Sequence, residues 1–241
     1  MNDLLEHVIS AHGGRERWLQ IGGLRVEATL HGSFWAVRGF SDEPFEETVT
    51  IDTRRELIRF SPWAKPDHDF VLRAEDDVVE LRAAADDSVL ETQSGIRSTY
   101  KGYDLTSPWK PLQVGYFIGY AMWNYLTTPF LFEYPGVSSR EGESWSENGE
   151  VWQRLHVEFP SFIATHTAEQ TFYFGDDGLL RRLDYNVDVN TGVAVVHYVS
   201  DYRTFEGIQV PTRRRVHRRN ADNSAGENWS IGIDINRVMA V

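Results

Sequence analysis

Residues 151–203 contain four strand-like runs: VWQRLHVEF (151–159), IATHTAEQTFYF (163–174), LLRRLDYNVDV (179–189) and VAVVHYVSDYR (193–203). The second, third and fourth runs are each followed by a turn that contains glycine. These turns are Asp-Asp-Gly (176–178), Asn-Thr-Gly (190–192) and Phe-Glu-Gly (205–207). Each turn fits a three-residue hairpin loop whose glycine takes the left-handed conformation. The stretch from Val151 to Val216 therefore predicts an antiparallel meander, in which the loops fix the register of neighbouring strands.

This register predicts two rows of polar side chains, one on each face of the sheet. The predicted partners are Phe174 and Leu180, Gln170 and Asp184, Glu169 and Tyr185, Tyr185 and His197, Asp184 and Tyr198, and His197 and Arg215. Opposed residues share a face, with Cβ atoms about 5 Å apart. We therefore expect Glu169, Tyr185 and His197 on one face. The other face should hold Gln170 and Asp184, with His166 farther along the same strand.

The rest of the chain adds helices to this meander. A first helix follows Asp3, with apolar residues on one stripe, and His12-Gly13-Gly14 ends it. A long strand is predicted over residues 24–39, interrupted at Gly32, and further alternating runs extend to Gly102. Residues 113–126 are predicted to be a helix, because apolar residues recur there at helical spacing until Thr127-Thr128-Pro129.

No shift in composition divides the chain, so residues 1–241 are expected to form a single domain. The predicted fold class is mainly β: a strongly curved antiparallel sheet, or unclosed β-barrel, with an N-terminal helix and a central helical insert at about residues 113–126. A curved sheet with a helix inside it can enclose a cavity for one small ligand.

Charge and composition exclude several classes of partner. The net charge of −12 disfavours nucleic acid and anionic membrane surfaces. The chain has no cysteine, which excludes disulfides and thiolate chemistry and suits a reducing, cytoplasmic location. The first ten residues lack the basic and long apolar segments of a signal peptide. Residues 111–132 carry no charge, but their glycines, Asn124 and Pro129 favour a buried helix over a membrane span.

The chain resembles the lipoprotein-carrier (LolA-like) superfamily of unclosed β-barrels. The resemblance rests on the order of elements and on the closing segment YFGDDGLLRRLDY…HYVSDYRTFEGIQVPTRRRV. The phrases GYAMWNYLTTPF, WSENGEVWQRLHVEFP and IATHTAEQTFYF also resemble those of a widespread family of bacterial proteins. The resemblance as a whole spans most of the chain from about Tyr103 onward and is weaker before that. The resemblance implies a concave sheet that holds an apolar ligand such as an acyl chain, and it brings no catalytic motif.

Two polar rows are candidates for chemistry. His166, Asp184 and Gln170 lie in sequence near aromatic residues, and a buried His–Asp pair can act as a general base. The alternative row of Glu169, Tyr185 and His197 can also exchange protons, and a one-residue slip would exchange the two faces. Either row is equally compatible with polar pairs on a sheet exterior or with structural hydrogen bonds.

Other motifs give weaker signals. The histidines are spread over several strands without metal-ligand spacing, so no metal is expected. No GxSxG and no phosphate-binding glycine loop is present, so no cofactor is expected. The basic run Arg213-Arg214-Arg215…Arg218-Arg219 alternates faces and is interpreted as a solvated edge strand.

The aromatic helix carries the strongest ligand signal. The candidate binding residues are Phe117, Tyr120, Trp123, Phe172 and Phe174, although plain core packing explains the same rings. The leading hypothesis is the binding of a small apolar or amphipathic molecule inside a half-open barrel. The alternative is a cofactor-independent lyase, isomerase or hydrolase that uses His and carboxylate groups in the same cavity. The oligomeric state is left open.

Overall fold

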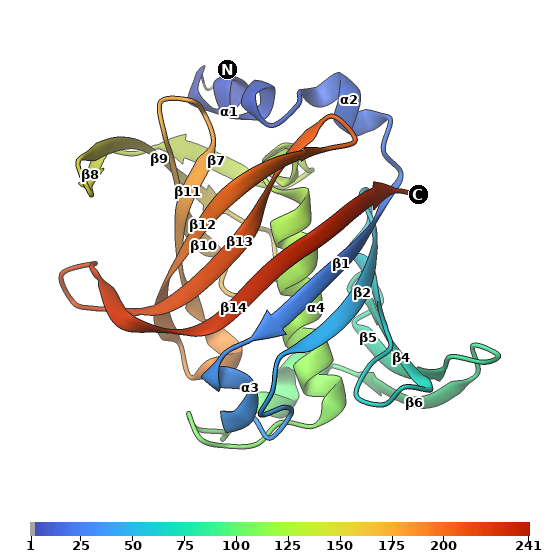
Figure 1. The fold of residues 1–241 in the computed structure, drawn as a ribbon. Helices are drawn as coiled ribbons and strands as arrows, with labels where there is room; N and C mark the ends of the chain where they lie inside the picture. Colours follow the sequence, from blue (N-terminus) through green and yellow to red (C-terminus); the bar gives the residue numbers. More distant parts are fainter. Residues whose placement is uncertain (1–2) are drawn as a thin grey trace.

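The computed structural model describes residues 3–241, in which one antiparallel sheet of 14 strands curves around a central helix (Figure 1). The sheet order is β6-β5-β4-β3-β2-β1-β14-β13-β12-β11-β10-β9-β7, with β8 paired to β9 alone. The first strand therefore pairs with the last, which joins the two ends of the chain at the middle of the sheet. The end strands β6 and β7 do not pair, so the sheet is not closed into a barrel.

The strands of the first half are β1 (Gly23–His31), β2 (Phe45–Asp52), β3 (Leu57–Ser61), β4 (His68–Arg73), β5 (Val78–Ala83) and β6 (Val89–Ser94). Those of the second half are β7 (Ser138–Glu141), β8 (Trp145–Glu147), β9 (Glu150–Glu158), β10 (Glu169–Phe174), β11 (Leu180–Val187), β12 (Val193–Phe205), β13 (Ile208–Arg219) and β14 (Ala225–Ala240). The helices are α1 (Asp3–Ala11), α2 (Arg15–Leu19), α3 (Ser33–Val37), α4 (Pro111–Thr127) and the 3-10 turns η1 (Ile96–Tyr100), η2 (Phe130–Glu133) and η3 (Asp188–Asn190). The predicted fold class is confirmed, including both predicted helices.

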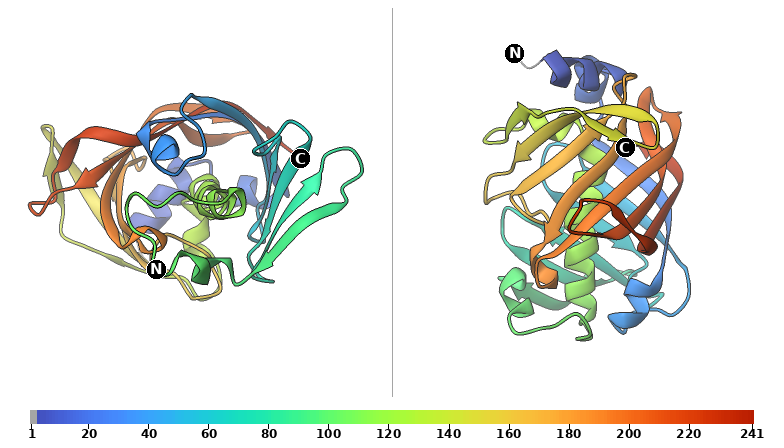
Figure 2. Two further views of the ribbon diagram at one scale, coloured as in Figure 1. Left: turned by 90° about the horizontal axis from the view of Figure 1, so that it is seen from below. Right: turned by 90° about the vertical axis from the view of Figure 1, so that its left-hand side faces the viewer.

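Helix α4 lies inside the curve of the sheet, and the view along it shows strands on both sides of it (Figure 2). Nearly every side chain of this helix is buried, which explains why its sequence is apolar on all sides. Gly115 and Gly119 allow it to approach the sheet closely. A Cβ at Gly115 would lie 2.5 Å from the ring of Phe70 on β4, closer than two carbon atoms can pack.

The hairpin glycines have the predicted conformation, but the registers differ from the prediction. Gly178, Gly192 and Gly207 all have positive φ angles. Phe174 pairs with Leu180 as predicted, and an extra residue on β11 then shifts the register by one, so that Thr171, not Gln170, is opposite Asp184. This β-bulge exchanges the faces of the two predicted β10 residues.

The next two hairpins differ for other local reasons. Residues 188–190 form η3, so β11 ends at Val187, and His197 is opposite Leu183 instead of Tyr185. A shift of two residues keeps His197 and Tyr185 on the same face. Glu206 and Gly207 form a two-residue turn with both φ angles positive, so Val216, not Arg215, is opposite His197. Arg215 consequently lies on the opposite face from His197.

Two further expectations are corrected. The strand predicted over residues 24–39 ends at His31, because the following segment forms α3 and buries Phe34 and Trp35. The basic run of residues 213–219 is not on an edge strand: β13 lies between β12 and β14. Its arginines therefore face either the inside of the curved sheet or its outer surface. Within residues 3–241, no helix is both long and apolar enough to cross a bilayer.

Candidate functional site

A cavity of about 240 Å³ lies between α4 and the inner face of the second half of the sheet. Phe117, Ile118 and Ala121 of α4 form one wall. The facing wall consists of branched aliphatic side chains from β12, β13 and β14: Val195, Val216, Ile231 and Ile233. These strands supply them because every second residue of a strand points to the same side.

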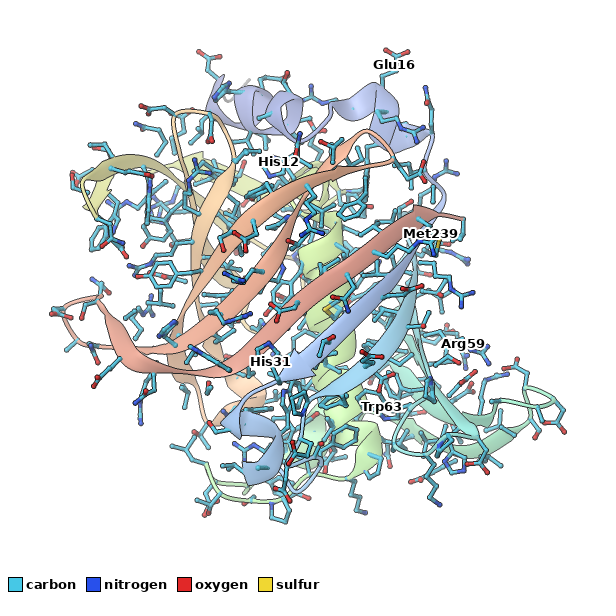
Figure 3. All side chains as sticks on the ribbon, viewed as in Figure 1. His12, Glu16, His31, Arg59, Trp63 and Met239 are labelled. Atoms are coloured by element: carbon cyan, nitrogen blue, oxygen red, sulfur yellow. The ribbon has the colours of Figure 1, made fainter. Side chains whose placement is uncertain are left out.

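The cavity has a mouth next to α3 and an inner end near the C-terminal turn of α4. Exposed residues border the mouth, among them Val37 of α3, Leu105 and Asn228. Figure 3 labels His31, the last residue of β1 on the side of α3, and His12, which directly follows α1. The inner end is formed by Tyr125, His166 and Tyr185, all buried.

A chain of buried hydrogen bonds begins at this inner end. The hydroxyl of Tyr120 lies 3.0 Å from Nδ1 of His166, and the hydroxyl of Tyr125 lies 2.8 Å from Nε2 of the same ring. The Tyr125 and Tyr185 hydroxyls are 2.9 Å apart, and the Tyr185 hydroxyl lies 3.2 Å from Nδ1 of His197. The rings of His166 and Tyr185 stack with centroids 4.2 Å apart.

His166 reaches this network from a loop and not from β10, which begins at Glu169. The loop is fixed from two directions. Arg97 donates hydrogen bonds to the carbonyl oxygens of Thr165 (2.8 Å) and His166 (3.3 Å), and Asn124 of α4 donates to that of Ala164 (2.9 Å). These contacts hold the imidazole against α4.

All members of the network are neutral at pH 7. Burial lowers the pKa of His166 to about 3, with the charge of Arg97 acting in the same direction, and burial lowers the pKa of His197 well below its usual range. Burial also raises the pKa of Tyr125 to about 12 and those of Tyr120 and Tyr185 well above 10. Among the described residues, no carboxylate hydrogen-bonds to either imidazole. The network therefore lacks a group poised to titrate near neutral pH.

The predicted site residues separate into two places. The inner face brings together His166, Tyr185 and His197. Gln170 is also buried, but its side chain donates to Thr165 and to the carbonyl oxygen of Thr167 (3.1 Å). Glu169 is exposed. The predicted contact among His166, Gln170 and Asp184 is wrong, because the β-bulge leaves Asp184 on the outer face.

Asp184 belongs to a separate buried cluster on the outer face of the sheet. Arg182 donates to its two oxygens at 2.7 Å each, and the hydroxyl of Tyr173 donates at 2.8 Å. Arg182 also donates to Glu147 of β8 at 2.6 Å. With all its partners in place, this carboxylate has the environment of a structural ion pair and not that of a free base.

The five aromatic candidates also differ in position. Phe117 lines the cavity, whereas Tyr120 reaches only the hydrogen-bond network. Trp123 faces the first half of the sheet and donates from its indole nitrogen to the carbonyl oxygen of Asp52 at 2.8 Å. Phe172 packs on Phe132, and Phe174 packs near His12.

Sequence reasoning missed the polar residues of the mouth. Arg38, which directly follows α3, and Arg218 of β13 both line it, together with Asn190. Arg218 belonged to the basic run, but alternation along β13 could not show which arginine faces a cavity. Arg38 gave no sequence signal, because the segment around it was predicted to be a strand.

Comparisons with known proteins place this architecture. No protein-family model and no curated protein matches the chain. Among solved structures, a LolA superfamily protein from Nitrosomonas europaea superposes with a TM-score of 0.55 over 97% of this chain and 92% of its own, at 6% identity. The fold is LolA-like. A domain from Vibrio parahaemolyticus, assigned to outer-membrane lipoprotein sorting, shows the same LolA-like fold with a TM-score of 0.53, covering 99% and 91% of the two chains at 9% identity.

Proposed function

We propose that this protein binds a small apolar or amphipathic molecule in the cavity between α4 and strands β12–β14. The observation that carries the proposal is the cavity itself: its long walls are aliphatic and aromatic, and its mouth reaches the surface. A volume of about 240 Å³ is just below the range of about 300–1,000 Å³ typical of small-molecule sites. A short or slender apolar ligand fits such a space.

The enzyme alternative receives less support. It depended on an imidazole paired with a carboxylate, and the described residues contain that arrangement at neither His166 nor His197. Cytoplasmic location stays part of the proposal and rests on the cysteine-free composition. Fractionation of cells expressing the tagged chain tests it.

The binding proposal is tested by filling the cavity from within. Ala121 of α4 lines the cavity, so Ala121→Met places a flexible apolar side chain inside it. N-phenyl-1-naphthylamine, a neutral apolar dye, should bind the unmodified protein saturably and the variant at least about tenfold more weakly, a loss of about 1.4 kcal/mol. Thermal stability should stay the same or rise, because the methionine fills a void.

Ala194→Met is the matched control. Ala194 precedes the lining residue Val195 on β12 and points to the opposite face. This variant should bind the dye like the unmodified protein. Equal dye affinity in Ala121→Met and Ala194→Met, or no saturable dye binding at all, contradicts the proposed function.

A further inference from the structure

We propose that the ligand is an amphipathic anion whose acidic headgroup is held at the mouth of the cavity by Arg38 and Arg218. Its apolar tail then points inward toward Tyr125 and Tyr185. The inference rests on the proposed function and adds the charge and the orientation of the ligand.

The first argument is the charge of the cavity wall. Two arginines line the cavity, and among the described residues no aspartate or glutamate does. This is unusual for a chain with 36 acidic and 24 basic residues. Positive charge without an ion-paired carboxylate at the entrance of an apolar site favours an anionic ligand.

The second argument is the environment of Arg38, which is 1% exposed. Its Nη1 donates to the carbonyl oxygens of Asp104 (3.1 Å) and Ser107 (2.8 Å), and its Nη2 donates to the side-chain oxygen of Asn190. All three acceptors are neutral, and the buried Nε has no partner. The Asp104 carboxylate acts on Arg38 only through space, and its effect on the pKa of Arg38 is smaller than that of burial. A buried guanidinium without an ion-paired carboxylate keeps most of its desolvation cost, which an anionic group beside it would offset.

The third argument is the position of Arg218. It is exposed, lines the same mouth, and has no ion-pair partner within residues 3–241. The three arginines of β13 that alternate onto the outer face differ: Arg213 pairs with Asp201, Arg215 with Asp234, and Arg219 with Asp184. Arg218 is therefore the arginine of this strand that is both free and directed at the cavity.

Carboxylates and phosphates both accept hydrogen bonds from guanidinium groups, so the shared chemistry is an acidic headgroup on an apolar tail. The test measures displacement of N-phenyl-1-naphthylamine by decanoate, decyl phosphate and the neutral decanol. Decanoate or decyl phosphate should bind at least about tenfold more tightly than decanol, which corresponds to one charge-assisted hydrogen bond. The tighter of the two anions identifies the headgroup.

Arg218→Met should remove this preference and leave decanol binding unchanged within about twofold. The exposed position of Arg218 makes misfolding a minor concern. Arg213→Met is the matched control, because it removes the same charge from the outer face of the same strand, and it should keep the preference. Arg38→Lys, which retains the charge, should keep more of the preference than Arg38→Met.

Three results would overturn the inference. Equal affinity for decanol and both anions would show that the site does not distinguish charged from neutral headgroups, while the proposed apolar binding would stand. Loss of the preference in Arg214→Met but not in Arg218→Met would place the headgroup at the inner end. Binding of none of the compounds would refute the proposed function as well.

Discussion

The two faces of the curved sheet differ in whether their buried charged side chains have a partner of opposite charge. On the outer face, the fully buried Arg182 contacts the carboxylates of Asp184 and Glu147 and the carbonyl oxygen of Asn223. On the inner face, the buried Arg214 donates to the carbonyl oxygen of Tyr125 at 3.2 Å and packs on the Tyr125 ring. Its Nε and Nη1 have no partner, and no carboxylate pairs with it among the described residues.

The same difference holds in the first half of the sheet. On the outer face, Glu80 accepts hydrogen bonds from Arg73 and Arg82, and the Arg73 contact lowers its pKa. On the inner face, Glu47 is buried with an unpaired carboxyl oxygen, and burial raises its pKa to about 8, with a smaller effect of Asp69. Outer charges thus stabilise the sheet through pairing, whereas inner charges cost stability.

The largest expected loss of stability follows from a substitution on the outer face. Asp184→Asn removes the more buried of the two carboxylates that compensate Arg182, so it should lower the free energy of unfolding by about 3–5 kcal/mol at pH 7. Urea denaturation followed by tryptophan fluorescence measures this change. Asp234→Asn is the control: Asp234 pairs with Arg215 at a half-exposed position, and its loss should cost at most about 1 kcal/mol. Equal losses in the two variants would refute the structural role of the Arg182–Asp184 pair.

The second-largest expected effect is the pH dependence of stability caused by a buried glutamate, which has opposite signs on the two faces. Glu47 is protonated in the folded protein up to a pKa of about 8 but ionises near pH 4.5 when unfolded, so the protein loses stability as the pH rises between these values. Glu47→Gln should therefore be more stable than the unmodified protein, and this advantage should grow as the pH rises. The free energy of unfolding changes by at most 1.36 kcal/mol per pH unit, so the advantage should be at most about 4 kcal/mol larger at pH 8 than at pH 5. Below pH 4.5 the difference in the free energy of unfolding between Glu47→Gln and the unmodified protein should become constant.

Glu80→Gln provides the contrast. The pKa of Glu80 is lowered in the folded protein, so its carboxylate contributes stability above the unfolded pKa, and this contribution is lost as the pH falls. The substitution should therefore destabilise the protein at pH 7. Unfolding curves from pH 4 to 9 measure both variants, and stabilisation by Glu80→Gln would contradict the comparison.

The smallest expected effect is at Arg214. Because its charge has no carboxylate partner, Arg214→Met should change the free energy of unfolding by less than about 1 kcal/mol or raise it. Arg182→Met, which removes the buried arginine shared by Asp184 and Glu147, should destabilise by at least about 3 kcal/mol. The two variants are compared by urea denaturation at the same pH. A similar cost for both would show that Arg214 is stabilised by contacts of equal strength, and the contrast between the faces would fail.

Sequence reasoning placed the candidate site in the second half of the sheet but joined the wrong residues within it. Tyr185 and His197 were predicted to share a face, and they do, because the register error between β11 and β12 was two residues. Asp184 was predicted to share a face with Gln170 and His166. It does not share a face with Gln170, because one extra residue on β11 reverses the relation between β10 and β11, and His166 lies in the loop before β10. An error of one residue exchanges the faces, whereas an error of two preserves them.

The sequence by itself determined the antiparallel meander, the glycine turns and the central helix, because each depends on periodicity and conformational preference within a short segment. The tertiary structure alone decided which face is enclosed and where the cavity opens. The mouth brings Arg38, next to α3, beside Arg218 of β13, because β1 pairs with β14 and so joins the start of the sheet to its end. Neither residue carries a local signal of this contact, since a cavity is defined by packing between distant segments and not by the pattern of any one of them.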